Sequence, residues 1–364
     1  MRQLKFVGMV MGKILLVANA VVALCMLFCA YSPYINPVKH PVQACVGLAF
    51  PVFLVFTVLF LLFWLVVYSR YAVVSVVAML CCAQSIYTVC PLHLFHKAVP
   101  QDAIKVLSYN VMSFESDHPD TPRNPNMILR YLSRSKADII CLQEYIVGGR
   151  LKQSDVDRVL ADYPYKDIRK VSGSWNGLAC YSRYPILSAR NIEYKSSYNG
   201  SAIYRIKKGE DTLTVINNHL ESNKLTFGDR EIYVKMIKSP EKVDMGKGSR
   251  LLLGKLADAT AIRAVQADTI AAVIRRHGAK NLIVCGDFNT SAISYTYRII
   301  SEGLIDAFVH SGNGLGISYH KNGFYFRIDN ILTSPDLKPY RCEVDRSISN
   351  SDHYPIWSYV APQR

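Results

Sequence analysis

The first hundred residues of this 364-residue chain contain neither aspartate nor glutamate. All 28 acidic residues therefore follow residue 100, and the first hundred carry only six cationic side chains. Between residues 47 and 67 no side chain is charged at all. A soluble amphipathic helix would carry a polar face, so this composition excludes an ordinary soluble N-terminal domain.

Three long apolar stretches fill this segment, over residues 4–30, 44–67 and 71–95. Each supplies the roughly 20 apolar residues that cross a bilayer core as a helix. Pro33, Pro37 and Pro41 separate the first stretch from the second. We expect a membrane anchor over residues 1–98 with three transmembrane helices. A cleaved signal peptide is the alternative for the first stretch, but that run is long and two more follow it directly.

The distribution of cationic residues predicts an orientation for this anchor. With three spans, two cations fall on one side, Lys39 and Lys97, and four on the other, namely Arg2, Lys5, Lys13 and Arg70. Lysine and arginine gather on the cytoplasmic side of membranes. The bias predicts a cytoplasmic N-terminus in a bacterial inner membrane, with the C-terminal domain on the periplasmic side. If one stretch does not span, the orientation reverses.

The chain has ten cysteines but no Cys-x-x-Cys spacing, which leaves no sign of a zinc or redox site. Cys141 and Cys285 lie inside apolar runs, so we expect buried free thiols. The four cysteines after residue 100 are too few for a disulfide framework in a domain of that size. A phosphate-binding Walker loop and a nucleophilic serine motif are also missing.

Residues 101–364 alternate strand and helix patterns, which predicts a layered α/β domain. We expect strands at 104–111, 137–143, 178–182, 202–207, 213–218, 281–285, 328–332 and 356–360, and helices at 126–135 and 255–277. Residues 222–253 are basic and show little periodicity. We interpret them as a basic flap beside the functional site, with a solvated insertion as the alternative. Subtracting the six N-terminal cations from the net charge of +14 leaves a net charge of +8 for residues 101–364, which suits acidic partners or a lysine-rich surface.

Short polar motifs follow the apolar runs of this domain. In chain order they are Ser108-Tyr109-Asn110, Leu142-Gln143-Glu144, Asn218-His219-Leu220, Gly286-Asp287-Phe288-Asn289, Arg327-Ile328-Asp329 and Ser351-Asp352-His353. Each motif alone occurs by chance in many proteins. Together they place carboxylates, amides and imidazoles where strands meet loops, and this inventory suits a divalent metal and a phosphate ester.

In this order the motifs resemble those of the endonuclease/exonuclease/phosphatase superfamily. That group includes DNase I-like nucleases, apurinic endonucleases, sphingomyelinases and inositol polyphosphate phosphatases. Blocks at 177–186, 217–220 and 352–356 fit the same pattern, so the resemblance covers residues 101–364. It implies a catalytic domain with a four-layer α/β sandwich, in which helices flank two packed sheets and the active site lies at one end of the sheets.

The resemblance implies a metal site and two weaker substrate contacts. Glu144 is the expected principal metal ligand with Asn110 beside it, and Asp352 supports the metal. The ion is Mg²⁺, with Mn²⁺ as the alternative. Arg183 is expected to help structure near the site or bind substrate, and Arg327 to contact substrate or form an ion pair.

The resemblance also implies the residues that act on water and phosphate. Asp287 activates or orients the attacking water, and Asn289 contacts the phosphate; a simple Asx turn is the alternative for both. His353 works with Asp329, either as a base or, protonated, by holding the phosphate. His219 protonates the leaving group or binds a phosphoryl oxygen.

These residues imply a membrane-anchored, metal-dependent hydrolase of phosphodiesters or phosphomonoesters. Nucleic acid, phospholipid and a phosphorylated small molecule are the candidate substrates, and the lipid bilayer is the expected partner. A tethered nuclease acting on DNA or RNA is the alternative. Basic charge favours it, whereas the lack of an aromatic basic platform for single strands does not. A binding module that had lost the chemistry should show a broken site, and every motif is intact. The oligomeric state is left open.

Overall fold

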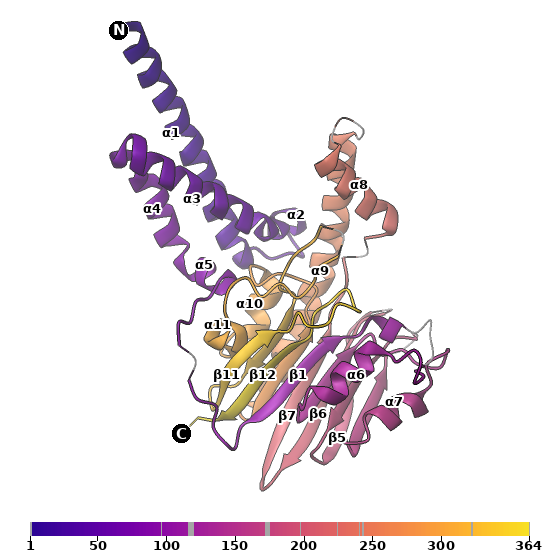
Figure 1. The fold of residues 1–364 in the computed structure, drawn as a ribbon. Coiled ribbons are helices and arrows are strands. Elements are labelled where there is room, and N and C mark those ends of the chain that lie inside the picture. Colours follow the sequence, from indigo (N-terminus) through magenta and orange to yellow (C-terminus); the bar gives the residue numbers. More distant parts are fainter. Residues whose placement is uncertain are drawn as a thin grey trace.

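Two six-stranded sheets form the body of the protein in the computed structural model (Figure 1). The structure describes residues 2–95, 97–115, 120–171, 175–196, 198–223, 225–239, 241, 244–321 and 323–363. One sheet has the strand order β11-β12-β1-β2-β4-β3, and the other has the order β5-β6-β7-β8-β10-β9.

The first sheet pairs β1 and β2 in parallel, so that Asn110 lies opposite Gln143, and its other pairs are antiparallel. Its strands are β1 (Ile104–Asn110), β2 (Ile139–Gln143), β3 (Tyr165–Lys170), β4 (Gly177–Ser182), β11 (Leu337–Val344) and β12 (Ile356–Pro362). Because carboxyl ends of parallel strands share one edge of a sheet, the Ser-Tyr-Asn and Leu-Gln-Glu motifs meet there.

The second sheet repeats this arrangement with β7 and β8 as its parallel pair. Its strands are β5 (Ile186–Ile192), β6 (Gly200–Lys208), β7 (Asp211–His219), β8 (Leu282–Asp287), β9 (Ile305–Asp306) and β10 (Asp329–Thr333). His219 lies opposite Asp287 in the parallel pairing, and Asp329 lies opposite Asp287 in the antiparallel pairing of β10 with β8. Three polar motifs therefore converge on one strand end.

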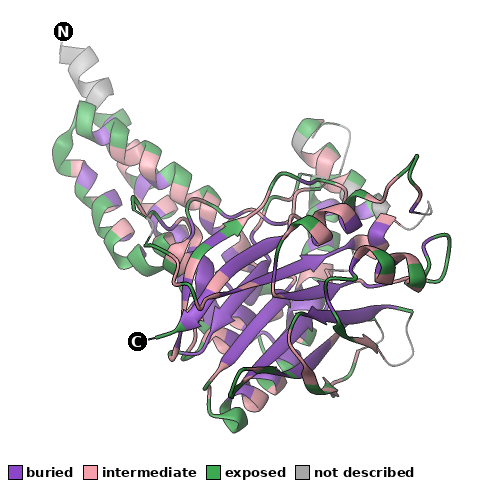
Figure 2. Cartoon of the chain, turned by 60° about the horizontal axis from the view of Figure 1, so that its bottom comes forward, coloured by how far each residue is buried: buried purple, intermediate pink, exposed green. Residues whose placement is uncertain are grey.

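Side chains on the two faces of each central strand enter different cores. Val106 and Ile139 lie between the sheets, whereas Leu107 and Ile140 face outward under helices. This burial on both faces explains why the strands appear as continuous apolar runs, and Figure 2 shows them as buried along most of their length. Helices complete the outer layers: α6 (Met127–Arg134), α7 (Gln153–Val159), α9 (Met245–His277) and α10 (Tyr295–Ser301). Helix α11 (Ala307–Ser311) instead packs Ala307 and Phe308 into the core between the sheets. The predicted four-layer α/β sandwich is confirmed.

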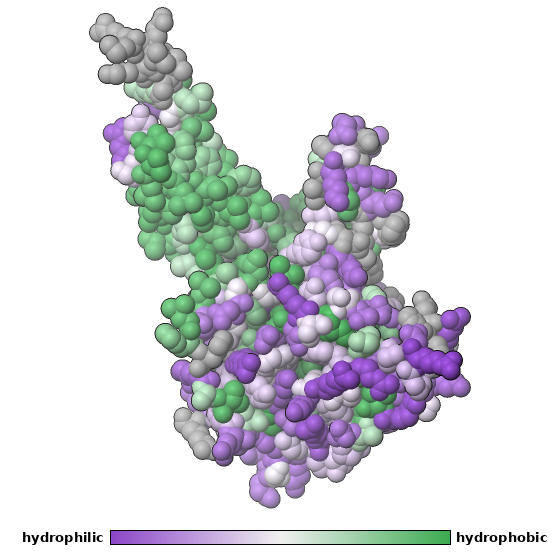
Figure 3. Space-filling model, in the orientation of Figure 1, coloured by the Kyte–Doolittle hydropathy of each residue, from purple (hydrophilic) through white to green (hydrophobic). Residues whose placement is uncertain are grey.

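The N-terminal segment forms a helical bundle that projects from the sandwich and is largely apolar on the side seen in Figure 3. It comprises α1 (Arg2–Tyr31), η1 (Ser32–Tyr34), α2 (Pro41–Ala44), η2 (Cys45–Ala49), α3 (Phe50–Val67), η3 (Ser69–Tyr71), α4 (Ala72–Cys81) and α5 (Ala83–Val89). Two stretches, Met9–Tyr34 and Pro41–Val67, are long and apolar enough to cross a membrane. The third predicted span is broken, because Ser69–Cys81 and Ala83–Val89 meet at 67°.

The bundle packs directly on the sandwich. Arg298 Nε of α10 donates to the carbonyl of Pro33 at 2.9 Å, and Cys45 Sγ donates to Thr260 Oγ1 of α9 at 3.3 Å. A Cβ at Gly47 would lie 2.1 Å from the carbonyl oxygen of Ile293 and 2.7 Å from Ser32 Oγ. Only glycine permits this close approach of the two backbones.

Gly47→Val is therefore expected to push the bundle away from the sandwich. Overpacking against an immobile backbone costs about 1–3 kcal/mol, which should lower the melting temperature of the full-length protein in detergent. Gly12→Val in α1 is the control, since its nearest neighbouring atom is Tyr68 Cε2 at 3.8 Å. Equal losses of stability in the two variants would show that the contact with Ile293 has no special weight.

The segment 222–253, interpreted as a basic flap with little periodicity, is largely helical. Helix α8 (Phe227–Lys238) begins there with a capping box between Thr226 and Asp229, and α9 starts at Met245, ten residues before the predicted 255. Helix α8 and the first part of α9 rise out of the sandwich (Figure 1), so this part of the chain lacks the one-sided apolar stripe of a helix packed on a sheet. Helix α9 ends at Gly278 as expected, in a left-handed conformation at φ 81°. Two basic residues of this segment, Lys224 and Lys242, lie outside the described residues.

Four strands were not predicted: β3, β5, β9 and β11. All four are the outer strands of the two sheets. Edge strands expose one face and carry charged side chains, as in the sequence Tyr-Lys-Asp-Ile-Arg-Lys of β3, so the apolar pattern that marks a strand is weak.

Candidate active site

Asp287 lies at the centre of the site, at the end of β8, and its side chain is buried. Gly286 before it has φ 127°, and a Cβ there would lie 2.0 Å from the carbonyl oxygen of Asn218 on β7. The carboxylate accepts hydrogen bonds from Asn110 Nδ2 at 3.1 Å, from the backbone N–H of Asn289 at 2.8 Å and from Asn289 Nδ2 at 3.1 Å. Burial raises the pKa of Asp287 to about 6, although His353 and His219 act in the opposite direction.

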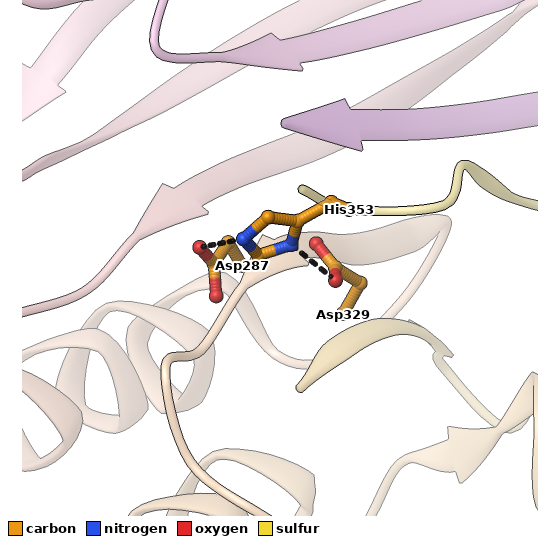
Figure 4. A group of neighbouring side chains, drawn as sticks. All are labelled: Asp287, Asp329 and His353. Atoms are coloured by element: carbon orange, nitrogen blue, oxygen red, sulfur yellow. Dashed lines mark hydrogen bonds and ion pairs between the residues drawn. The ribbon is translucent and has the colours of Figure 1, made fainter. Parts of the chain in front are cut away.

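His353 forms a hydrogen-bonded pair with Asp329 (Figure 4). Its Nδ1 lies 2.8 Å from Asp329 Oδ2, and its Nε2 lies 3.6 Å from Asp287 Oδ2. Burial alone would lower the pKa of His353, but the negative charges of Asp329 and Asp287 outweigh it and raise the pKa to about 10. The imidazole therefore carries a proton at neutral pH between two carboxylates.

Glu144 extends the site from the end of β2. It takes a left-handed backbone conformation at φ 51°, which is uncommon for a residue with a side chain and is often found at functional sites. Asn110 Nδ2 donates to Glu144 Oε1 at 3.2 Å as well as to Asp287, so this amide links the ends of the two sheets. Asn289, on the other side of Asp287, has φ 51°.

His219 is buried between these carboxylates. Its Nε2 lies 3.6 Å from Glu144 Oε1 and 3.8 Å from Asp287 Oδ2. Burial lowers its pKa more than the charge of Asp287 raises it, so the ring is neutral at neutral pH. Asn176 Nδ2 lies 3.2 Å from His219 Nδ1, and since an amide nitrogen only donates, Nδ1 accepts and Nε2 carries the proton. Sequence reasoning missed Asn176, which directly precedes the Gly177 block.

The donor set fits a hard divalent cation. Glu144 and Asp287 supply carboxylate oxygens, which Mg²⁺ prefers as ligands. Asn110 directs its Nδ2 at both carboxylates, while its Oδ1 accepts from the backbone N–H of Met112. Asp329 Oδ1 is buried without a hydrogen-bond partner among the described residues, as is expected of an oxygen that faces a cation or a water. The carboxylates of Asp287 and Asp329 and the imidazole of His353 lie within 4.8 Å of one another, and because His353 is protonated only the two carboxylates could ligate a cation. Asp352 lines the same cavity of about 420 Å³, as do Glu144, Asp287, Asn289 and His353.

The two arginines lie elsewhere. Arg183 is 3.8 Å from Asp138 at the start of β2, at the opposite end of that strand from Glu144. Arg327 is buried and binds Asp306 Oδ2 at 2.8 Å, and its other amino group donates to the carbonyl of Thr88 at 3.3 Å. The ion-pair interpretation of Arg327 is therefore the one the structure supports, and these positions do not favour a substrate-binding role for either arginine.

The model of the Endonuclease/Exonuclease/phosphatase family matches residues 107–353, and a domain of unknown function (DUF8431) matches residues 12–89. No curated protein matches the chain.

Several solved structures are similar over the sandwich. Truncated TDP2 of Caenorhabditis elegans is 16% identical, with 72% of this chain and 99% of that chain covered and a TM-score of 0.49. TDP2 of D. rerio, complexed with single strand DNA product, is 14% identical, with 72% of this chain and 100% of that chain covered and a TM-score of 0.47. An endonuclease/exonuclease/phosphatase from Beutenbergia cavernae is 13% identical, with 72% of each chain covered and a TM-score of 0.49.

Proposed function

The chain belongs to the endonuclease/exonuclease/phosphatase family, and on this premise we propose that it is a membrane-anchored, Mg²⁺-dependent phosphoesterase. Water would act as the nucleophile on a phosphodiester or phosphomonoester. The observation that carries this proposal is the buried cluster in which Asp287 lies between Asn110, His219, Asn289 and His353.

Glu144 is the proposed principal metal ligand, with Asn110 beside it and Asp352 supporting the metal, and Mn²⁺ is the alternative ion. When bound, the cation supplies positive charge that stabilises the phosphoryl oxygens as negative charge develops on them. Asn110 donates to both Glu144 and Asp287, so it fixes the two carboxylates relative to each other.

Asp287 is the proposed base. It receives a proton from the attacking water, whose oxygen forms the new bond to phosphorus. Its pKa of about 6 leaves it ionised at neutral pH while keeping it basic enough to accept that proton. Asn289 directs an amide N–H at Asp287 at 3.1 Å and thereby orients the carboxylate, and it lies in the same cavity for contact with the phosphate.

The two histidines act in different protonation states. Protonated His353, held by Asp329, donates from Nε2 to a phosphoryl oxygen. Neutral His219 donates a hydrogen bond from its Nε2 N–H to a second phosphoryl oxygen, and Asn176 keeps that proton on Nε2. The leaving oxygen takes its proton from solvent water as the ester bond breaks. This division follows from the geometry, because only His353 has a carboxylate on Nδ1.

The anchor is proposed to comprise residues 1–98 and the catalytic domain residues 101–364. We propose that the bent pair Ser69–Cys81 and Ala83–Val89 forms a third span, which puts the catalytic domain on the periplasmic side of a bacterial inner membrane. The two membrane-length helical stretches support the anchoring. A tethered nuclease is the second candidate, and the surplus positive charge of the chain favours it.

The proposal is tested by assaying the full-length protein in detergent with Mg²⁺ against p-nitrophenyl phosphate and methyl p-nitrophenyl phosphate. We expect release of p-nitrophenol from at least one ester. We also expect the release to stop with a chelator and to return when Mg²⁺ is restored in excess. Hydrolysis that persists after chelation contradicts the metal dependence, and hydrolysis of neither ester contradicts the proposal.

A further inference from the structure

The cavity that contains the carboxylates has one wall made by the membrane bundle. Leu48 and Ala49 of η2 and Val52 of α3 line it, and all three belong to the apolar stretch Pro41–Val67. Resting on the proposed function, we infer that the substrate is a membrane-resident phosphoester. Its apolar chain lies along α3 while its phosphate lies at Asp287.

The wall opposite α3 is also apolar. Tyr233 of α8 stacks on Phe324 with ring centroids 4.2 Å apart, and Leu256 of α9 and Phe326 lie beside them. The catalytic carboxylates and His353 form the remaining, polar side of the same cavity. A cavity that is polar on one side and apolar on the others matches an amphiphile, whose head and tail need different surroundings.

The apolar wall continues away from the site along one face of α3. Val52 is 54% exposed, and the exposed residues Val55, Leu59, Leu62 and Val66 follow it at intervals of three and four. Residues so spaced lie on one side of a helix. This face leads from the cavity along the apolar stretch Pro41–Val67, in a bundle that is largely apolar on the side seen in Figure 3, so a chain held by the bilayer can reach the site without leaving an apolar surrounding.

The hairpin of α8 and α9 bounds the cavity on its other side and projects beside the bundle (Figure 1). Its outer part carries exposed cations, including Lys235 and Lys247, and the exposed apolar residues Met245 and Leu251. Basic side chains interspersed with apolar ones suit the headgroup region of a membrane. This composition places the mouth of the cavity at the membrane surface.

A nucleic acid fits this cavity poorly. The described residues that line it include no lysine or arginine, although binding to a polyphosphate backbone depends on such cations. The basic side chains of the described residues therefore lie outside the cavity, where they can meet anionic lipid rather than the substrate.

The experiment uses the full-length protein with Mg²⁺ in dodecyl maltoside micelles. Two matched pairs of esters differ only in the apolar chain: hexadecyl and methyl p-nitrophenyl phosphate as diesters, and hexadecyl and ethyl phosphate as monoesters. An oligothymidylate is the nucleic-acid substrate. We expect kcat/KM to favour the hexadecyl ester of one pair by about tenfold or more, because each buried methylene contributes to binding.

Micelles also concentrate long-chain esters, so two variants separate this effect from binding in the cavity. Val52→Trp fills the cavity wall and keeps α3 apolar, and we expect it to lower the ratio of hexadecyl to short-chain kcat/KM by roughly tenfold. Val77→Trp places the same side chain on an exposed position of α4 outside the cavity, and the ratio should remain that of the wild type.

The outcomes distinguish this inference from the function on which it rests. Three results overturn the inference and leave the phosphoesterase standing: equal kcat/KM within a pair, a ratio that Val52→Trp does not change, or preferred cleavage of the oligothymidylate. Failure to hydrolyse any of the substrates overturns both.

Discussion

Asp287→Asn is expected to lower kcat by about 10²- to 10⁴-fold while the protein stays folded, because the variant removes the proposed base and keeps its shape. The amide cannot take a proton from water. It also presents an N–H where Asn110 and Asn289 now donate at 3.1 Å, so the local hydrogen bonds oppose it. Steady-state kinetics on the p-nitrophenyl esters, with a thermal melt of each preparation, measure both effects.

Asp162→Asn is the matched control, since it makes the same change at an exposed position outside the cavity. It should retain wild-type kcat. If Asp287→Asn also keeps kcat within a few fold of the wild type, Asp287 is not the base and the proposed division of roles fails.

The second large effect concerns the pair of His353 and Asp329. His353→Ala and Asp329→Asn are each expected to lower kcat/KM by about 10²- to 10⁴-fold, and the double variant should be hardly worse than the poorer single one. The reason is that Asp329 acts through His353, whose Nδ1 it holds at 2.8 Å. A double-mutant cycle on kcat/KM measures this coupling.

The pH dependence of Asp329→Asn gives a readout that loss of structure would not produce. Burial lowers the pKa of His353, but neighbouring negative charges raise it to about 10, and the charge of Asp329 has the largest raising effect. Without this carboxylate the pKa falls, so His353 loses its proton at lower pH and the alkaline limb of the rate profile moves to lower pH. An alkaline limb that stays where it is in the wild type would show that protonated His353 is not required.

Sequence reasoning was most successful where chemistry coincides with strand ends. Asn110, Glu144 and Asp287 each end or follow a buried strand, and parallel pairing brings such ends to one edge, so their convergence could be predicted from the order of motifs. Asn176 could not be found in this way. Its role depends on the approach of its amide to His219, and asparagine before a glycine is ordinarily a turn residue.

The contacts made by the membrane bundle were beyond sequence reasoning for a different reason. An apolar span shows only that a helix is long and uncharged, and nothing in Leu48 or Val52 distinguishes a residue that faces lipid from one that lines a cavity. The partners of Arg327 could not be predicted either, because Asp306 and Thr88 are distant from Arg327 in the chain. Such contacts arise from tertiary packing, which leaves no periodic pattern in the sequence.

The measurement that tests the central claim most directly is the rate of ester hydrolysis as a function of Mg²⁺ concentration for the wild type and for Glu144→Gln. The account predicts a saturable dependence in the wild type. In the variant it predicts a half-maximal Mg²⁺ concentration raised by about 10- to 100-fold or activity lost altogether, because a neutral amide replaces the proposed principal ligand. Identical Mg²⁺ dependence in the two proteins would contradict the assignment of this site as the metal-dependent catalytic centre.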